Sequence, residues 1–145
     1  MRSPSRRTSE CRRPRDEGTA VLEVLALGVG LLVPLLYAVV SVMSLQAASF
    51  AATSAAREAA RTYVTASTTA QGALRARTAM RLVLADAGMT AAAPTVRCVG
   101  GCLVPGSRVD VTVRVEVALP LLTGGPTITV TGQDSMPVDR YRSAP

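Results

Sequence analysis

Cys98 and Cys102, in the segment CVGGC, have a type and spacing that suit either a metal site or a disulfide. Zinc sites use spacings such as C-x₂-C together with two further ligands. The chain contains no His and no second cysteine pair, so we predict no metal site. We favour a disulfide over free thiols, because closing this five-residue loop stabilises a fold by about 2 kcal/mol on a chain-entropy estimate.

The remaining chemical inventory does not predict an enzyme or a cofactor. No Ser, Thr or Cys stands beside a recognisable base, and no phosphate-binding glycine loop follows a predicted strand. The acidic residues beyond the apolar run are far apart in the sequence; they include Asp86, Asp110, Glu116, Asp134 and Asp139. On a strand, Asp110 and Glu116 are most simply solvated charges.

Glu23 lies at the start of an apolar run and is the next residue with unusual chemistry. From Val24 to Leu45 there are 22 residues without a charge, a helix of about 33 Å, which matches a hydrocarbon core of about 30 Å. A carboxylate near such a segment costs up to about 2.5–3.5 kcal/mol at the bilayer centre. We therefore expect Glu23 either to have a partner or to reach the cytoplasmic interface.

The flank before the apolar run sets the expected orientation. Residues 1–18 carry six Arg against three acids, so the positive-inside rule places this end in the cytoplasm and the C-terminal part outside. Cys98 and Cys102 are then in an oxidising compartment, which suits a disulfide. A secretory signal cut near Ala47 is an alternative, but the run is longer than a signal peptide's apolar region and has an acid near its start.

The net charge of +6 does not indicate nucleic-acid binding. Half of it belongs to residues 1–18, and the rest is spread thinly with no aromatic residues interleaved for stacking on bases. We therefore expect a membrane, and no nucleic acid, among the partners.

The N-terminal pattern resembles that of type IV prepilins and pseudopilins. An Arg-rich leader ends in Gly18, the small residue Thr19 follows, and Glu23 is the fifth residue of the apolar helix. The segments LLVPLLYAVV and AAREAARTYV look more narrowly like TadE-like minor pilins of tight-adherence (Flp-type) systems. No aromatic pair follows Glu23, which favours a minor pilin over a main fibre subunit.

The resemblance implies processing and assembly. A prepilin peptidase is expected to cut between Gly18 and Thr19, and the new amine of Thr19 to pair with Glu23 of a neighbouring subunit. The implied partners are this peptidase, other pilins and the pilus assembly machinery. The alternative is a single-pass envelope anchor that is never cut and has a structural or accessory role.

Residues 46–88 are predicted to be helical, because they are rich in Ala and contain no Pro. TASTT at residues 65–69 and Gly72 are poor helix formers that favour a break, and Gly88 ends the segment. The apolar stripe expected to face a core consists of Ala73, Ala76, Met80, Val83, Leu84 and Ala87.

The last third of the chain predicts a small antiparallel sheet. Valines alternate with polar residues across SRVDVTVRVEVALP, a period of two that is typical of a strand. Further strands are expected in TVRCVGGC and TITVTG, the latter joined through the turn TGGP. The predicted fold is α+β, in four segments: a leader at 1–18, a transmembrane helix at 19–45, an amphipathic extracytoplasmic helix at 46–88 and a β-sheet domain at 95–145.

Overall fold

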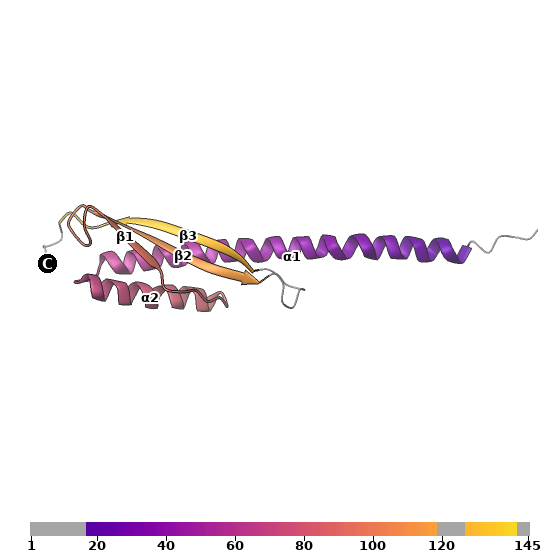
Figure 1. Ribbon diagram of the computed structural model, residues 1–145, viewed down its shortest axis with the longest axis horizontal. Coiled ribbons are helices and arrows are strands. Elements are labelled where there is room, and N and C mark those ends of the chain that lie inside the picture. Colours follow the sequence, from indigo (N-terminus) through magenta and orange to yellow (C-terminus); the bar gives the residue numbers. More distant parts are fainter. Residues whose placement is uncertain (1–16, 119–126, 142–145) are drawn as a thin grey trace, which may run out of the picture. The chain divides into compact units, whose positions relative to one another are not determined.

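The computed structural model describes residues 17–118 and 127–141, and it has the predicted α+β fold (Figure 1). The described elements, in chain order, are α1 (Glu17–Val64), α2 (Thr69–Asp86), β1 (Thr95–Val99), β2 (Arg108–Ala118) and β3 (Thr127–Pro137). The leader up to residue 16 and the turn TGGP lie outside the described residues, so the predictions made for them are untested.

The chain forms two compact units, one up to Leu36 and the other from Tyr37 onward. In its described part the first unit is the beginning of α1, whose apolar side chains are exposed. The second unit contains the rest of α1, α2 and the sheet. The predicted limits of the leader and the transmembrane segment stay predictions.

Within the second unit, α1 presents a face made almost entirely of alanine. The buried residues recur at spacings of three and four, which places them on one side of the helix; they are Ala48, Ala51, Ala52, Ala55, Ala56, Ala59, Ala60 and Tyr63. Because a methyl group is the whole side chain, strand backbone can come very close to this face. A Cβ built on Gly132 of β3 would collide with the backbone of Ala52 and Thr53.

The predicted break in the helical region is confirmed, and it lies between Val64 and Thr69. Thr68 is the N-cap of α2: its hydroxyl accepts a hydrogen bond from the backbone N–H of Gln71 at 3.2 Å. The Gln71 amide oxygen in turn accepts from the N–H of Ser67 at 3.1 Å. The first bond satisfies a backbone donor that a helix start leaves free, and the second holds the residue before the cap, so the TASTT segment acts as a cap rather than a loose hinge.

The predicted end of the helical segment at Gly88 is also confirmed. α2 ends at Asp86, and Gly88 has a φ of +67°, in the left-handed region that glycine adopts without strain. Its N–H donates to the carbonyl of Ala85 at 2.9 Å, which closes the last turn.

The buried face of α2 agrees only partly with the predicted stripe. Ala76, Met80 and Leu84 are buried and Val83 is half-buried, but Ala73 and Ala87 are exposed. The prediction was wrong at these two positions because the contact line has a four-residue spacing that starts at Gly72. A Cβ on Gly72 would lie 3.1 Å from Cδ2 of Tyr63. Because glycine has no side chain, α2 can lie close to the Tyr63 ring of α1.

The sheet has the order β1-β2-β3 with both pairs antiparallel. The alternation predicted for β2 is confirmed, since Val109, Val111, Val113 and Val115 are buried and the residues between them are not. β3 is longer than the predicted TITVTG. It continues to Pro137 because β2 supplies a partner along its whole length, down to Arg108 opposite Pro137.

One hydrophobic cluster joins the alanines of α1, Met80 and Leu84 of α2, and the β2 valines. Since these valines share one face of the strand, both helices cover the same side of the sheet and the other side is open. Leu103 and Val138 complete the cluster. The second unit is therefore two layers with few large side chains between them.

The contact between Gly132 and Ala52 leads to a stability prediction. In Gly132→Ala the new methyl group must push β3 away from α1, which we expect to lower the free energy of unfolding by about 2 kcal/mol and Tm by roughly 10 °C. Thermal denaturation followed by circular dichroism measures this. Gly28→Ala is the matched control, because a Cβ at Gly28 meets no atom within 4 Å. Equal melting of the two variants would contradict the predicted contact.

Candidate functional site

Glu23 and Thr19 lie one helical turn apart on the same side of α1. Both side chains are exposed, and within residues 17–118 and 127–141 the Glu23 carboxylate has no hydrogen bond and no ion pair. The structure therefore brings together the two positions that the resemblance singled out, on one face of one helix. None of the described residues supplies a cation that pairs with the Glu23 carboxylate.

The surface around Glu23 consists of large apolar side chains that nothing in the described chain covers. Val24 is 71% exposed and Leu27 is 67% exposed, and the same holds along the helix to Leu36. By length and composition this part of α1 can span a membrane, and its most apolar stretch is entirely unburied. Such a surface is stable against lipid or against other apolar helices, not in water.

The Gly18–Thr19 peptide bond lies in the first turn of α1, which begins at Glu17. A protease binds its substrate in extended form, so this turn must unwind before the bond can be cut. The cost is small, because the first four N–H groups of a helix have no intrahelical partner. Gly18 lowers it further through its poor helix propensity.

Gly28 and Ala20 create a hollow along α1, on a different side from Glu23. It is lined by residues four apart, Ala20, Val24, Gly28 and Leu32, with Val21, Leu25 and Val29 beside them. At 100° per residue, Gly28 is about 140° around the helix from Glu23. The acid and the hollow thus lie on different sides of α1.

The structure places Cys98 and Cys102 at disulfide distance, with their Cα atoms 5.1 Å apart. Cys98 is in β1, and Cys102 follows the turn formed by Gly100 and Gly101, both at positive φ. In the described part of the chain, no three His, Cys, Asp or Glu side chains gather as metal ligands. The geometry suits the disulfide that the sequence favours.

The residue directly after this pair has an unusual role that the sequence did not indicate. Leu103 is the one non-glycine residue with positive φ in the described chain, at 61°, yet it is 2% exposed and belongs to the core cluster. A left-handed leucine costs about 1–2 kcal/mol. The burial of its side chain offsets this cost, so the loop closed by the cysteines seals one end of the core.

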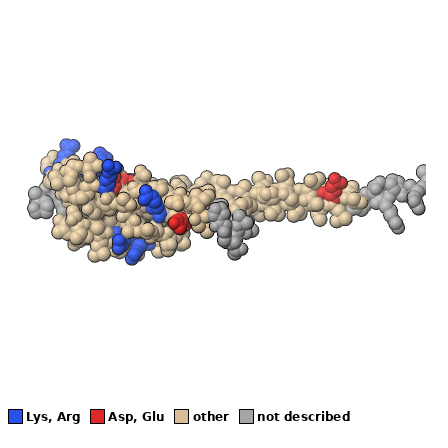
Figure 2. Space-filling model, viewed as in Figure 1, with Lys and Arg blue, Asp and Glu red and all other residues tan. Residues whose placement is uncertain are grey.

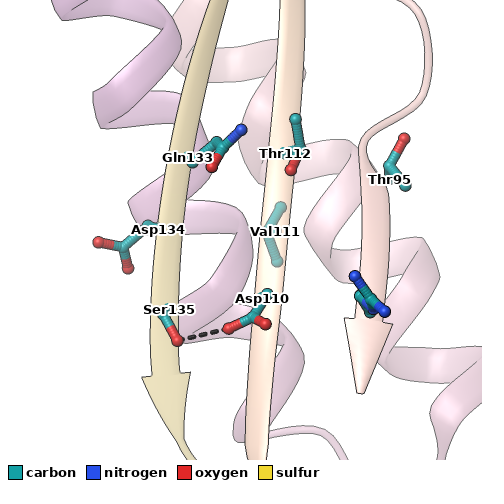
Figure 3. Close-up of a pocket in the computed structure, with 8 residues that line it drawn as sticks. Thr95, Asp110, Val111, Thr112, Gln133, Asp134 and Ser135 are labelled. Atoms are coloured by element: carbon teal, nitrogen blue, oxygen red, sulfur yellow. Dashed lines mark hydrogen bonds between the residues drawn. The ribbon is translucent and has the colours of Figure 1, made fainter. Parts of the chain in front are cut away.

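The open face of the sheet contains a second candidate site (Figure 3). A hollow of about 660 Å³ lies over residues from all three strands, among them Arg97, Asp110 and Ser135. The Ser135 hydroxyl donates to the Asp110 carboxylate at 2.5 Å, and Arg108 donates to the Ser135 oxygen at 3.3 Å. The sequence suggested that Asp110 is simply a solvated charge, but in the structure its carboxylate accepts a hydrogen bond.

The Ser135–Asp110 hydrogen bond links two neighbouring strands across the open face of the sheet. The sequence did not reveal the contact because Ser135 lies beyond the predicted end of the third strand. Only the register, which sets Asp110 opposite Ser135, brings them together.

Comparisons with known proteins add no relative to this geometry. No protein-family model, no curated protein and no solved structure matches the chain. The likeness to pilins therefore depends on the residues from Gly18 to about Val64 alone.

The cysteine pair leads to a prediction about stability and redox state. Replacing both Cys98 and Cys102 with Ala removes a loop constraint, which we expect to cost about 2 kcal/mol in urea unfolding. A thiol reductant should destabilise the wild-type protein by a similar amount and leave the double variant unchanged. A wild-type protein insensitive to reductant would show that the cysteines contribute no such constraint.

Proposed function

We propose that this chain is a TadE-like minor pilin or pseudopilin, processed between Gly18 and Thr19 and built into a type IV, tight-adherence pilus. One observation supports the proposal above all: Glu23 is an acid on an exposed apolar helix, has no partner among the described residues, and lies one turn from the expected new N-terminus.

The physical reason concerns the charge in lipid. A carboxylate within a membrane segment is stabilised by pairing with a cation at the same depth. Cleavage after Gly18 creates an ammonium group on Thr19, one helical turn from Glu23 along the axis, so a neighbouring helix offset by about one turn brings its amine to the depth of Glu23. When helices pack side by side, the amine of one subunit meets Glu23 of the next, and the pair fixes the axial register between subunits.

Membrane insertion in the proposed orientation follows from the arginines of residues 1–18. The N-terminus is cytoplasmic, where a prepilin peptidase acts, and the second unit is extracytoplasmic, where Cys98 and Cys102 can be oxidised. The proposed partners are this peptidase, the other pilins and the assembly machinery.

A second candidate function is an uncleaved single-pass envelope anchor with a structural or accessory role. It is favoured by one observation, the position of the Gly18–Thr19 bond inside the first turn of α1, where a protease cannot bind it without unwinding the helix.

The mature N-terminus distinguishes these functions. We expect N-terminal sequencing of the membrane-extracted protein to begin at Thr19, and a Gly18→Val variant to keep its leader because the added side chain obstructs the protease cleft. Gly30→Val, further along the same helix, is the control and should still be processed. An intact leader on the wild-type protein supports the anchor instead, and a start near Ala47 supports a secreted protein.

The pairing mechanism has its own test. We expect Glu23→Gln to lower incorporation into pili by about tenfold, a loss near 1.4 kcal/mol, while the amount in the membrane stays the same. Quantitative immunoblotting of sheared pili against membrane fractions measures this. Glu116→Gln, which alters an exposed acid of β2, should behave as wild type.

Pairing between Glu23 and Thr19 of the same chain is the competing arrangement, because the two lie one turn apart. It predicts normal incorporation of Glu23→Gln, since no contact between subunits is lost. That outcome would contradict the mechanism even if cleavage after Gly18 is found.

A further inference from the structure

The outward face of α2 is unusual because it combines exposed leucines with arginines. Leu74 is 67% exposed and Leu82 is 64% exposed, and they stand eight residues apart with Thr78 between them. At 100° per residue this row lies opposite the buried line that runs from Gly72 to Leu84. The leucines therefore contribute nothing to the core of the second unit.

This row forms one wall of a groove between α2 and α1. A hollow of about 490 Å³ is lined by Leu74, Arg75, Thr78, Ala79, Leu82 and Val83 from α2, and by Glu58, Thr62 and Thr65 from α1. Glu58 is already engaged, because Arg61 donates to both of its oxygens at 3.0 and 3.1 Å. The acid on the α1 wall of the groove is therefore paired with an arginine of the same helix.

Arginines flank the row of leucines on both sides. Arg75 adjoins Leu74 on the groove side, while Arg77 and Arg81 lie on the other side of the row. Among the residues that the structure describes, none of the three forms an ion pair, and Asp86 is the one acid of α2. Figure 2 shows basic side chains over the region of α2. Apart from Glu58, which is paired with Arg61, the charged groups that border the leucines are therefore arginines without an ion pair among the described residues.

From this combination we infer that the face of α2 defined by Leu74, Thr78 and Leu82 is a docking site for an amphipathic helix of another protein. The partner helix has an apolar stripe bordered by Asp or Glu. Its apolar side chains enter the groove as those of one helix enter the groove of another, and its carboxylates meet Arg75, Arg77 and Arg81. The inferred docking site does not depend on whether the leader is removed.

A second copy of α2 does not meet these requirements. In a two-fold antiparallel pair that sets Leu74 against Leu82 of the other copy, Arg75 falls opposite Arg81, and like charges placed together across an interface are strongly unfavourable. A bilayer surface matches the charge less specifically, since a flat surface does not fill a groove between two helices. Charge and shape together select an acidic helix.

The test uses the full chain in nanodiscs of neutral phosphatidylcholine and two synthetic helical peptides. Both have leucines at spacings of three and four; one has glutamates beside them and the other has lysines. By fluorescence anisotropy we expect the glutamate peptide to bind about tenfold more tightly than the lysine peptide, with an affinity that falls as salt rises.

Matched variants distinguish binding at this face of α2 from a general effect of the protein's positive charge. Arg75→Gln with Arg81→Gln should weaken binding of the glutamate peptide about fivefold or more, whereas Arg97→Gln with Arg114→Gln removes the same charge from the sheet and should leave it unchanged. Leu74→Ser with Leu82→Ser should abolish binding without lowering Tm, since both leucines are exposed.

Two results would overturn the inference. One is equal binding of the two peptides, or equal weakening by the α2 and sheet variants. The other is binding of added phosphatidylglycerol vesicles, lost with Arg75→Gln and Arg81→Gln, while neither peptide binds, which would make this face a membrane-contact surface instead.

Discussion

The close approach of β3 to the backbone of α1 is the constraint on which the second unit depends. At Gly132 the strand lies directly on Ala52, with no room for a Cβ between them. An alanine face on one side and a glycine on the other make this possible, and the result is a thin interface between helix and sheet. Larger residues at either position would separate the layers and open the row of β2 valines to water.

Because the interface is thin, the stability of the second unit depends strongly on the few large side chains at its margins. Met80 and Leu84 of α2 fill the space beside the alanines, and Leu103 closes one end of the cluster. Leu103 is held in a left-handed conformation directly after the Cys98–Cys102 loop. The cysteine pair and the cap at Thr68 therefore have similar roles. Each fixes a segment that places large side chains in a core with few of them: Leu103 after the cysteines, and Met80 and Leu84 in α2.

Periodicity in the sequence predicted that the helices and strands exist, whereas the full length of β3 and the contacts between elements depend on pairing in space. The alternating valines predicted β2, and TASTT and Gly88 predicted the ends of α2. Alanine, however, occurs on both buried and exposed helix faces of this chain, so neither the α1 contact face nor the exposure of Ala73 could be predicted. The Ser135–Asp110 hydrogen bond depends on strand register, which no local pattern encodes. For Glu23 the motif alone indicated a role, since the oddity is chemical and local.

The arginines of α2 and Glu23 have no ion pair among the described residues, and they differ in what their surroundings demand. Arg75, Arg77 and Arg81 are hydrated in water, where an unpaired surface charge costs almost nothing. A partner helix would therefore add binding specificity and is not needed for the stability of the fold. Glu23 lies among side chains suited to lipid, where an unpaired carboxylate costs up to about 2.5–3.5 kcal/mol at the bilayer centre. The first feature tolerates a free state and suits reversible docking. The second disfavours a free state, so in the proposed assembly contact with a cation of another subunit would contribute to the stability of the helix in the membrane.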